Sequence, residues 1–375
     1  MNESKRGWVE ASKVSLKGID VTLSAPVLVG RSRGYFWFPQ LVLLSNGDLA
    51  ALITPYPDEH RSSPAGLISW SGDGGLTWSA PIEYKPIGYA NIRLPNGDQL
   101  ILPYYLRPCP DGMTEAYNVI PRGKKEVECV EPGVTVTGWP RKDKSLAANL
   151  GLAGFVFNGQ SVRTRDGSYL AMLYGYFEGA KRLSLVAAES RDAVHWRIRS
   201  VIADDTCDLP GADGPSESAV CRIADGRLMC VFRLGPGNPY GQVWSSDEGR
   251  TWTKPVAMNG VFSVEPSLAV MKDGTVALSG GRPGLFLWLN TDGTGKDWQR
   301  VDLVPNHNQC HPKDAITEPL TGRTTSYTEI IALDDDHLLC IYDRIPNGWD
   351  AIPREMNDTN SVWVVRVAVR RVPTS

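Results

Sequence analysis

One pattern occurs six times along the chain: an apolar strand, a tight turn and a second apolar strand. Five of the turns contain Asn-Gly or Asp-Gly, the dipeptides that favour short β-hairpins. The turns lie about 50 to 70 residues apart, at Gly47, Gly97, Gly167, Gly226, Gly274 and Asp336. Repeats of this length predict an all-β fold, a six-bladed β-propeller of four-stranded antiparallel sheets, formed by residues 1–375 as a single domain.

A second repeated motif, which we call the Asp turn, follows two of these hairpins. It has the pattern Ser-x-Asp-x-Gly-x-Thr-Trp and occupies residues 71–78 and 245–252. In such a turn the carboxylate can accept backbone N–H groups, the glycine permits positive φ, and the tryptophan can cover the gap between neighbouring sheets. Weaker copies surround Asp192 and Asp292. We therefore expect the motif to stabilise the fold and not to take part in catalysis.

The composition argues against several classes of partner. The formal net charge is -3 and the pI is about 6.0, so the chain lacks the positive field of proteins that bind nucleic acid or anionic membranes. Seven cysteines without a Cys-x-x-Cys pair argue against a disulfide framework or a zinc site. Because the sequence shows no long apolar run, we expect a cytoplasmic protein, or a secreted or periplasmic one if a signal peptide has been removed.

The ends of the repeated strands carry an unusual set of charged and aromatic residues. In an antiparallel sheet, the start of the first strand and the end of the second lie at the same edge. Fixed offsets from the six turns place at that edge Glu217, Glu265, Tyr327, Arg233, Arg282, Asp343 and Arg344. Such a group predicts either a ring of structural ion pairs or a pocket in which arginines bind an anion and a Tyr–Glu pair does covalent chemistry.

The hairpins and Asp turns together resemble the sialidase superfamily, whose members carry repeated Asp-boxes and fold as six-bladed β-propellers. The resemblance extends from Arg33 to Val372. Sialidases hold a substrate carboxylate with three arginines and use a tyrosine nucleophile, a glutamate partner and an aspartate acid/base. The resemblance therefore implies a carbohydrate substrate that carries a carboxylate. We expect no cofactor or metal ion, and the charge of the chain argues against nucleic acid or a membrane as a partner.

Carried onto this sequence, the resemblance implies a role for each matching residue. The implied catalytic residues are Tyr327 as nucleophile, Glu217 as the base that takes its proton, and Asp58 as acid/base, chosen over Glu59 and His60. A tyrosine has an ordinary pKa of about 10 and attacks well only when a neighbouring base can take its proton. The implied substrate-binding residues are Arg233, Arg282, Glu265, Asp343 and His60, with Asp343 at the place of the acid that supports the first arginine.

One position departs from the family. Sialidases have Arg-x-Pro in the first repeat, where this chain has Trp37, Phe38 and Pro39. Trp37 therefore replaces the first arginine, and we expect it either to stack against a sugar ring or to fill the core. The arginines that could supply the missing cation are Arg31, Arg33, Arg61 and Arg344.

Three functions are compatible with these residues. The resemblance favours an exo-acting, retaining glycoside hydrolase that removes a terminal acidic sugar. The alternatives are a polysaccharide lyase that acts on uronates, with Tyr327 and either His60 or His311 as acid and base, and a glycan-binding propeller without catalysis. The stretch that contains His307, Cys310 and His311 is expected to be a loop and not a metal site, because the sequence indicates no further ligands.

Overall fold

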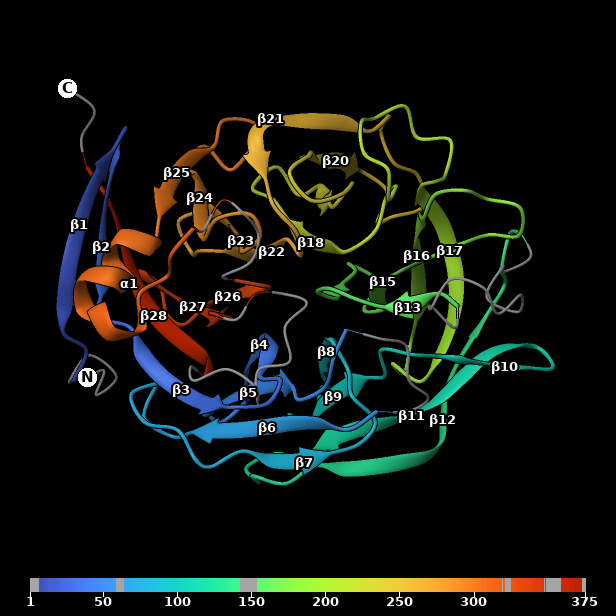
Figure 1. The fold of residues 1–375 in the computed structure, drawn as a ribbon. Coiled ribbons are helices and arrows are strands. Elements are labelled where there is room, and N and C mark those ends of the chain that lie inside the picture. Colours follow the sequence, from blue (N-terminus) through green and yellow to red (C-terminus); the bar gives the residue numbers. More distant parts are fainter. Residues whose placement is uncertain are drawn as a thin grey trace.

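The computed structural model describes residues 7–58, 64–141, 154–318, 320, 325–346, 348 and 359–372. These residues form sheets that surround a common centre (Figure 1). Strands account for nearly all of the regular structure, and the ordinary helix is limited to one short segment of the described residues. The prediction of a β fold built from antiparallel sheets is confirmed.

Three sheets contain four antiparallel strands each, joined in chain order. The first consists of β4 (Trp37–Leu43), β5 (Leu49–Thr54), β6 (Gly66–Ser71) and β7 (Ile82–Tyr84). The second consists of β18 (Ser218–Arg222), β19 (Leu228–Phe232), β20 (Pro239–Ser245) and β21 (Val256–Phe262). The third consists of β22 (Ser267–Val270), β23 (Val276–Gly280), β24 (Phe286–Asn290) and β25 (Gln299–Asp302).

A ten-stranded sheet contains two further hairpin repeats. One group is β8 (Ala90–Arg93), β9 (Gln99–Leu102), β10 (Arg107–Cys109), β11 (Gly112–Ile120) and β12 (Glu128–Thr137). The other is β13 (Val156–Phe157), β14 (Val162–Arg163), β15 (Tyr169–Gly175), β16 (Ser184–Ser190) and β17 (His195–Ala203). Parallel pairing of β12 with β17, in which Val136 lies opposite Trp196, joins the two groups at their outer strands.

The remaining sheet joins the two ends of the described chain. It contains β1 (Glu10–Leu16), β2 (Ile19–Ser24), β28 (Asn360–Arg371), β27 (His337–Arg344) and β26 (Thr328–Ala332) in this order, and β3 (Val27–Ser32) also pairs with β28. In Figure 1 the blue and red segments lie side by side, in agreement with the pairing of Ile19 with Arg371. A helix, α1 (Val304–Cys310), lies beside β1, where Ser12 donates a hydrogen bond to Asn306, and it is followed by a 3-10 turn, η3 (Pro312–Asp314).

The six predicted hairpins are all present. The first turn is closed by a backbone hydrogen bond from Gly47 N to Leu44 O at 3.0 Å, and Gly47 has a φ of 90° that a side chain would disfavour. The sixth turn, around Asp336, uses no glycine and is closed by a bond from Leu333 N to His337 O at 2.9 Å.

Inner strands are buried on both faces because each sheet lies between two others. In β5, Ala50 and Leu52 pack into an apolar cluster that includes Ile101 of the next sheet. Ala51, one residue along the same strand, packs into a different cluster that includes Leu339 of the last sheet. Alternate side chains of a strand point to opposite faces. The core is therefore a series of apolar layers between sheets, and polar groups collect at the strand ends.

The Asp turns connect the third and fourth strands of their sheets. Asp73 accepts hydrogen bonds from the backbone N–H of Thr77 at 2.9 Å, from the Thr77 hydroxyl at 2.6 Å and from the Ser71 hydroxyl at 2.8 Å. The Trp78 indole N–H donates to a carbonyl inside the turn. Asp247 makes the equivalent contacts in the second copy. The predicted structural role of this motif agrees with these contacts.

Candidate active site

Tyr327 and Glu217 meet although 110 positions separate them in the sequence. Tyr327 immediately precedes β26 and Glu217 immediately precedes β18, which are inner strands of two different sheets. The Tyr327 hydroxyl donates a hydrogen bond to Glu217 Oε1. Burial raises the pKa of Tyr327 well above its ordinary value, and the Glu217 carboxylate raises it further. Both effects favour the protonated form of the Tyr327 hydroxyl.

Arg233, which directly follows β19, holds Glu217 in place. One terminal nitrogen of the guanidinium donates to Glu217 Oε1 at 2.6 Å, and the other donates to Asp213 Oδ2 at 3.0 Å. Burial alone would lower the pKa of Arg233, but Glu217, Tyr327 and Asp213 raise it above its ordinary value. Arg233 is therefore a permanent cation that orients the Glu217 carboxylate.

Glu265 brings a second carboxyl group close to Glu217. The backbone N–H of Glu265 donates to Glu217 Oε2 at 2.9 Å, and Asn158 Nδ2 donates to both carboxyl oxygens of Glu265 at 3.1 and 3.3 Å. Burial raises the pKa of Glu265 well above its ordinary value, and the charge of Glu217 raises it further. Adjacent buried carboxyl groups do not both ionise readily.

Asp343, near the end of β27, fixes the backbone beneath the site. It is fully buried and accepts hydrogen bonds from Ser326 N at 2.6 Å, from Phe38 N at 3.1 Å and from the Ser326 hydroxyl. Burial raises the pKa of Asp343 to about 6. The ring of Phe38 packs on that of Tyr327, with centroids 4.5 Å apart. Asp343 therefore holds the segments that carry Phe38 and Tyr327, whereas the resemblance implied that it supports an arginine.

A small pocket opens beside Tyr327. Its lining is mainly aromatic and consists of Phe38, Thr54, Tyr56, Asp58, Tyr89, Tyr104, Tyr105, Asn158 and Tyr327. Asp58 is the carboxylate of this lining and lies at the exposed rim. Surrounding protein atoms displace water from the carboxyl group and raise the pKa of Asp58, an effect that Arg282 opposes and Glu217 reinforces. A carboxyl group with a raised pKa is suited to act as a general acid.

Arg282, which lies two residues after β23, completes this group. Its guanidinium carbon lies 5.9 Å from the centroid of the Tyr327 ring, and its backbone N–H donates to Ser263 Oγ at 2.8 Å. Burial lowers the pKa of Arg282, and the neighbouring Tyr327 opposes this shift. The structure therefore brings together these residues predicted from the sequence: Tyr327, Glu217, Glu265, Arg233 and Arg282, with Asp58 at the rim.

Comparison with solved structures finds close similarity of fold at low sequence identity. A protein of unknown function from Dyadobacter fermentans matches with a TM-score of 0.67 and 16% identity, over 93% of this chain and 99% of that chain. The α-L-arabinanase of Penicillium chrysogenum, complexed with arabinobiose, has a TM-score of 0.59 and 17% identity, over 92% and 98% of the two chains. The NanB sialidase of Streptococcus pneumoniae has a TM-score of 0.57 and 14% identity, over 93% and 71%. The chain has a sialidase-like fold.

Two of these neighbours are glycoside hydrolases that are named for different sugars. A sialidase-like fold alone therefore indicates no particular substrate. A scan against protein-family models finds no match, and neither does a search of curated proteins.

Trp37, at the place of the first sialidase arginine, lies in the core of this sialidase-like fold. It is 1% exposed, and its indole N–H donates to Tyr56 O at 2.9 Å. The rings of Tyr35 and Phe38 pack against it, with centroid distances of 5.0 and 4.8 Å. Trp37 does not line the pocket. Its position fits a core residue and offers no face for stacking against a sugar.

The arginines expected to replace the first arginine lie elsewhere. Arg344 Nε donates to Ala315 O at 3.2 Å, and Arg344 Nη1 lies 3.8 Å from Asp314. Arg31 also contacts Asp314, at 3.2 Å, and Arg33 is exposed. Among the described residues, Arg31 and Arg344 thus both contact Asp314, and neither lines the Tyr327 pocket. Glu59, His60 and Arg61, the remaining candidates, lie outside the described residues.

The histidines near α1 make hydrogen bonds within the fold. His307 Nδ1 lies 2.8 Å from the Tyr342 hydroxyl, His307 Nε2 lies 2.9 Å from Asp314 O, and His311 Nε2 lies 2.8 Å from Pro26 O. Burial lowers the pKa of His307 to about 4. The segment is helical where a loop was predicted, because the proline in its first turn suits a helix start. Among the described residues, no group of three His, Cys, Asp or Glu side chains could hold a metal ion, and no helix could cross a membrane.

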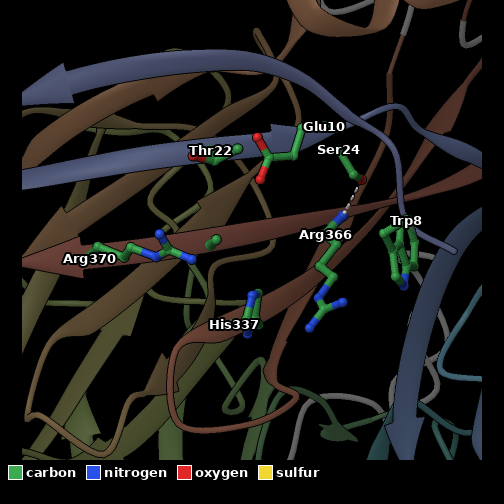
Figure 2. A pocket seen from close by; sticks show the side chains of 8 residues that line it. Trp8, Glu10, Thr22, Ser24, His337, Arg366 and Arg370 are labelled. Atoms are coloured by element: carbon green, nitrogen blue, oxygen red, sulfur yellow. Dashed lines mark hydrogen bonds between the residues drawn. The ribbon is translucent and has the colours of Figure 1, made fainter. Parts of the chain in front are cut away.

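A second hollow lies between Trp8 and the strands β2, β27 and β28 (Figure 2). Its polar side chains contact other groups of the fold: His337 Nδ1 lies 2.6 Å from Asp334, and Arg366 lies 3.4 Å from Asp334. Ser24 Oγ accepts a hydrogen bond from Arg366 N at 3.0 Å. The residues described around this hollow include no nucleophile hydrogen-bonded to a base, so the Tyr327 pocket is the stronger candidate for an active site.

The sequence prediction missed Asp213 and the aromatic walls. The strand offsets that located the arginines also reach Tyr104 and Tyr174, whose hydroxyls lie 2.6 Å apart, so these two could have been chosen. Tyr56 and Tyr105 lie beyond the strand ends. Asp213 lies in the connection between β17 and β18, whose length follows no repeat, and no sequence signal marks it.

Proposed function

We propose that the protein is a retaining glycoside hydrolase in which Tyr327 attacks the anomeric carbon of a terminal sugar. The observation that supports this proposal most strongly is the hydrogen bond from the Tyr327 hydroxyl to Glu217, at the side of an aromatic pocket. A tyrosine and a carboxylate in direct contact form a nucleophile with its base.

The reaction proceeds in two steps. First, the Tyr327 oxygen bonds to the anomeric carbon as Glu217 accepts the phenol proton. The glycosidic bond breaks, its electron pair goes to the leaving oxygen, and Asp58 protonates that oxygen. Next, water attacks the glycosyl–tyrosine and gives a proton to Asp58, while Glu217 returns its proton to Tyr327. Both groups regain their starting states, and the product keeps the anomeric configuration of the substrate.

The remaining residues hold this pair in its reactive arrangement. Arg233 and the backbone N–H of Glu265 bind the two oxygens of Glu217, which fixes the orientation of the base. Asp343 and Phe38 support the segment that carries Tyr327. A pre-oriented nucleophile and base lower the entropic part of the barrier. The aromatic lining of the pocket suits contact with a sugar, and we propose an exo mode of cleavage at a terminal unit.

The alternatives receive less support from the described residues. Of the two histidines considered for a lyase, His311 bonds to Pro26 O, away from the pocket, and His60 lies outside the described residues. A protein that only binds glycans has no need of a buried Tyr–Glu pair with raised tyrosine pKa. We also propose that the six hairpins form the six blades of one domain. We further propose that the substrate is a carbohydrate and that its hydrolysis needs no metal ion.

The stereochemistry of the product tests the proposed function. Aryl glycosides of several terminal sugars, neutral and acidic, are offered to the protein, and the first product is followed by NMR. We expect a reducing sugar with the anomeric configuration of the substrate. An inverted product would contradict the tyrosine nucleophile, and an unsaturated product that absorbs ultraviolet light would show a lyase. Absence of turnover across the panel would contradict the proposed enzyme class.

A further inference from the structure

Both terminal nitrogens of the Arg233 guanidinium already donate to carboxylates of the protein. Glu217 Oε1 accepts from one at 2.6 Å, and Asp213 Oδ2 accepts from the other at 3.0 Å. A carboxylate binds arginine most strongly through two parallel N–H groups. A carboxylate on the substrate would therefore have to displace Asp213 or Glu217 and would be repelled by both negative charges.

We propose that Asp213 is a specificity-determining residue. By pairing with Arg233, it prevents this arginine from binding the carboxylate of an acidic sugar, so that the pocket selects an uncharged terminal sugar. This inference rests on the proposed function, because it concerns the substrate of the same site. It departs from the acidic sugar that the sequence resemblance implied. Asp213 acts through Arg233 and is therefore a positioning residue with no direct part in the reaction.

The charges around the pocket support an uncharged substrate. Among the described residues, the cations Arg233 and Arg282 face the carboxylates of Asp58, Asp213 and Glu217, so the site has no surplus of positive charge. Neither arginine belongs to the pocket lining, which is formed by tyrosines, Phe38, Thr54, Asn158 and Asp58. Aromatic faces and hydroxyl or amide groups bind the apolar faces and hydroxyls of neutral sugars.

Asp213 is held in place by the surrounding backbone. Its carbonyl oxygen accepts a hydrogen bond from Leu183 N at 2.8 Å. Arg182 secures the earlier part of the same connection by donating to Cys207 O at 2.9 Å and to Leu209 O at 3.1 Å. The contact between Asp213 and Arg233 therefore belongs to an organised loop that approaches the site from the β17–β18 connection.

The test compares Asp213→Asn with a matched control, Asp205→Asn. Asparagine keeps the size of Asp213 and an oxygen that can accept from Arg233, but removes the charge. Asp205 lies in the same connection and pairs with Arg141 at 2.8 Å, and it is not among the residues that line the pocket. The ratio of kcat/KM for an acidic to a neutral aryl glycoside is measured for the parent and both variants, with the melting temperature of each as a control for folding.

We expect the parent and Asp205→Asn to favour the neutral glycoside, and Asp213→Asn to raise the acidic-to-neutral ratio about tenfold or more. A parent that favours the acidic glycoside, or an Asp213→Asn protein whose ratio is unchanged, would overturn the role of Asp213 while leaving the proposed hydrolase intact.

A binding measurement separates this inference from the proposed reaction. Calorimetric titration of the Tyr327→Phe protein with neutral monosaccharides and with free uronic and sialic acids requires no turnover. We expect the neutral sugars to bind more tightly than the acids. Adding Asp213→Asn to the Tyr327→Phe protein should reduce this difference in affinity. Preferential binding of the acids, or binding of neither class, would contradict the inference, whatever the outcome of the stereochemical test.

Discussion

The pKa values of carboxyl groups shift in opposite directions at the two ends of the sheets. In the Asp turns, several hydrogen bonds to the ionised form lower the pKa of Asp73, and they lower the pKa of Asp247 to about 2, against the opposing effect of partial burial. At the pocket end, burial raises the pKa of Asp343 to about 6, and it raises that of Glu265 well above its ordinary value. Folding therefore favours the ionised form of the two carboxylates in the Asp turns and disfavours the ionised form of these two carboxylates at the pocket end.

Left-handed backbone conformations occur at both ends of the sheets. In the Asp turns, positive φ falls on Gly75 (95°) and Gly249 (80°), and also on Glu248 (63°). At the pocket end, positive φ falls on residues with side chains, 50° at Phe38 and 40° at Glu265, and both lie against the Tyr–Glu pair. Such conformations cost roughly 1–3 kcal/mol each. At the pocket end, these two strained residues lie against the residues proposed to react.

Tyr327→Phe should have the largest effect on function and little effect on stability. Loss of the nucleophilic oxygen is expected to reduce kcat by about 1000-fold or more. The matched control is Tyr342→Phe, which removes a buried hydroxyl bonded to His307 in the core beside α1. The control should lose about 1–2 kcal/mol of stability and keep its activity. Equal activities of the two variants would break the distinction between the pocket and the rest of the fold.

Trp37→Ala tests whether the position of the missing arginine belongs to the pocket or to the core. Because Trp37 is 1% exposed and its indole is hydrogen-bonded, we expect a loss of about 3–5 kcal/mol in the free energy of unfolding. Denaturant titration measures this loss. A variant of near-parental stability whose substrate binding is selectively weakened would instead support a sugar-stacking tryptophan.

Glu329→Gln tests the comparison through the pH dependence of folding stability. Glu329 accepts a hydrogen bond from Leu41 N at 2.5 Å, and burial raises its pKa from 4.5 to about 8. Between these values the unfolded chain releases the proton while the folded protein keeps it, so the parent loses stability as pH rises from about 4.5 to about 8. The variant should be more stable than the parent by about 3 kcal/mol at pH 7, with the difference vanishing near pH 4.5. A difference that is independent of pH would contradict a buried, protonated Glu329.

Asp247→Ala should have the smallest of these effects and the opposite dependence on pH. The Asp247 carboxylate accepts bonds from Arg250 N, Thr251 N and the hydroxyls of Thr251 and Ser245. Its removal should cost about 2 kcal/mol at neutral pH and progressively less as pH falls from about 4 to about 2, where the parent carboxylate becomes protonated. Chemical denaturation at several pH values measures this. Lost activity without lost stability would assign a catalytic role to the turn.

The parts of the molecule that repeat could be predicted from the sequence. The hairpins and Asp turns depend on local turn chemistry, which is why Gly47 and Asp73 lie in the predicted turns. Fixed offsets from the repeated hairpin turns also locate the charged residues and the tyrosine of the site, so their convergence follows from the repeat. These residues are Glu217, Arg233, Arg282 and Tyr327. Asp213 could not be found in this way, because the connection that carries it has no counterpart in other repeats.

Two residues on the repeated strands have roles that their positions alone could not reveal. Asp343 lies at a predicted strand end, but its hydrogen bonds go to the backbone of Ser326 and Phe38. Trp37 could have faced either the pocket or the core, and the neighbouring positive φ of Phe38 is the kind of local irregularity that the strand pattern does not specify. Side-chain direction at an irregular strand start depends on contacts with distant segments.

The most direct test of the account is to trap the covalent intermediate. In a 2-deoxy-2-fluoro glycosyl fluoride of the sugar that the protein hydrolyses fastest, the 2-fluorine slows both steps and the fluoride leaving group speeds the first. The covalent intermediate then accumulates, and the labelled protein can be digested and sequenced by mass spectrometry. We predict one sugar unit attached to the Tyr327 oxygen, with no label in the Tyr327→Phe protein. A label on Glu217, Glu265 or Asp58 would show that a carboxylate attacks the sugar and would contradict the tyrosine nucleophile.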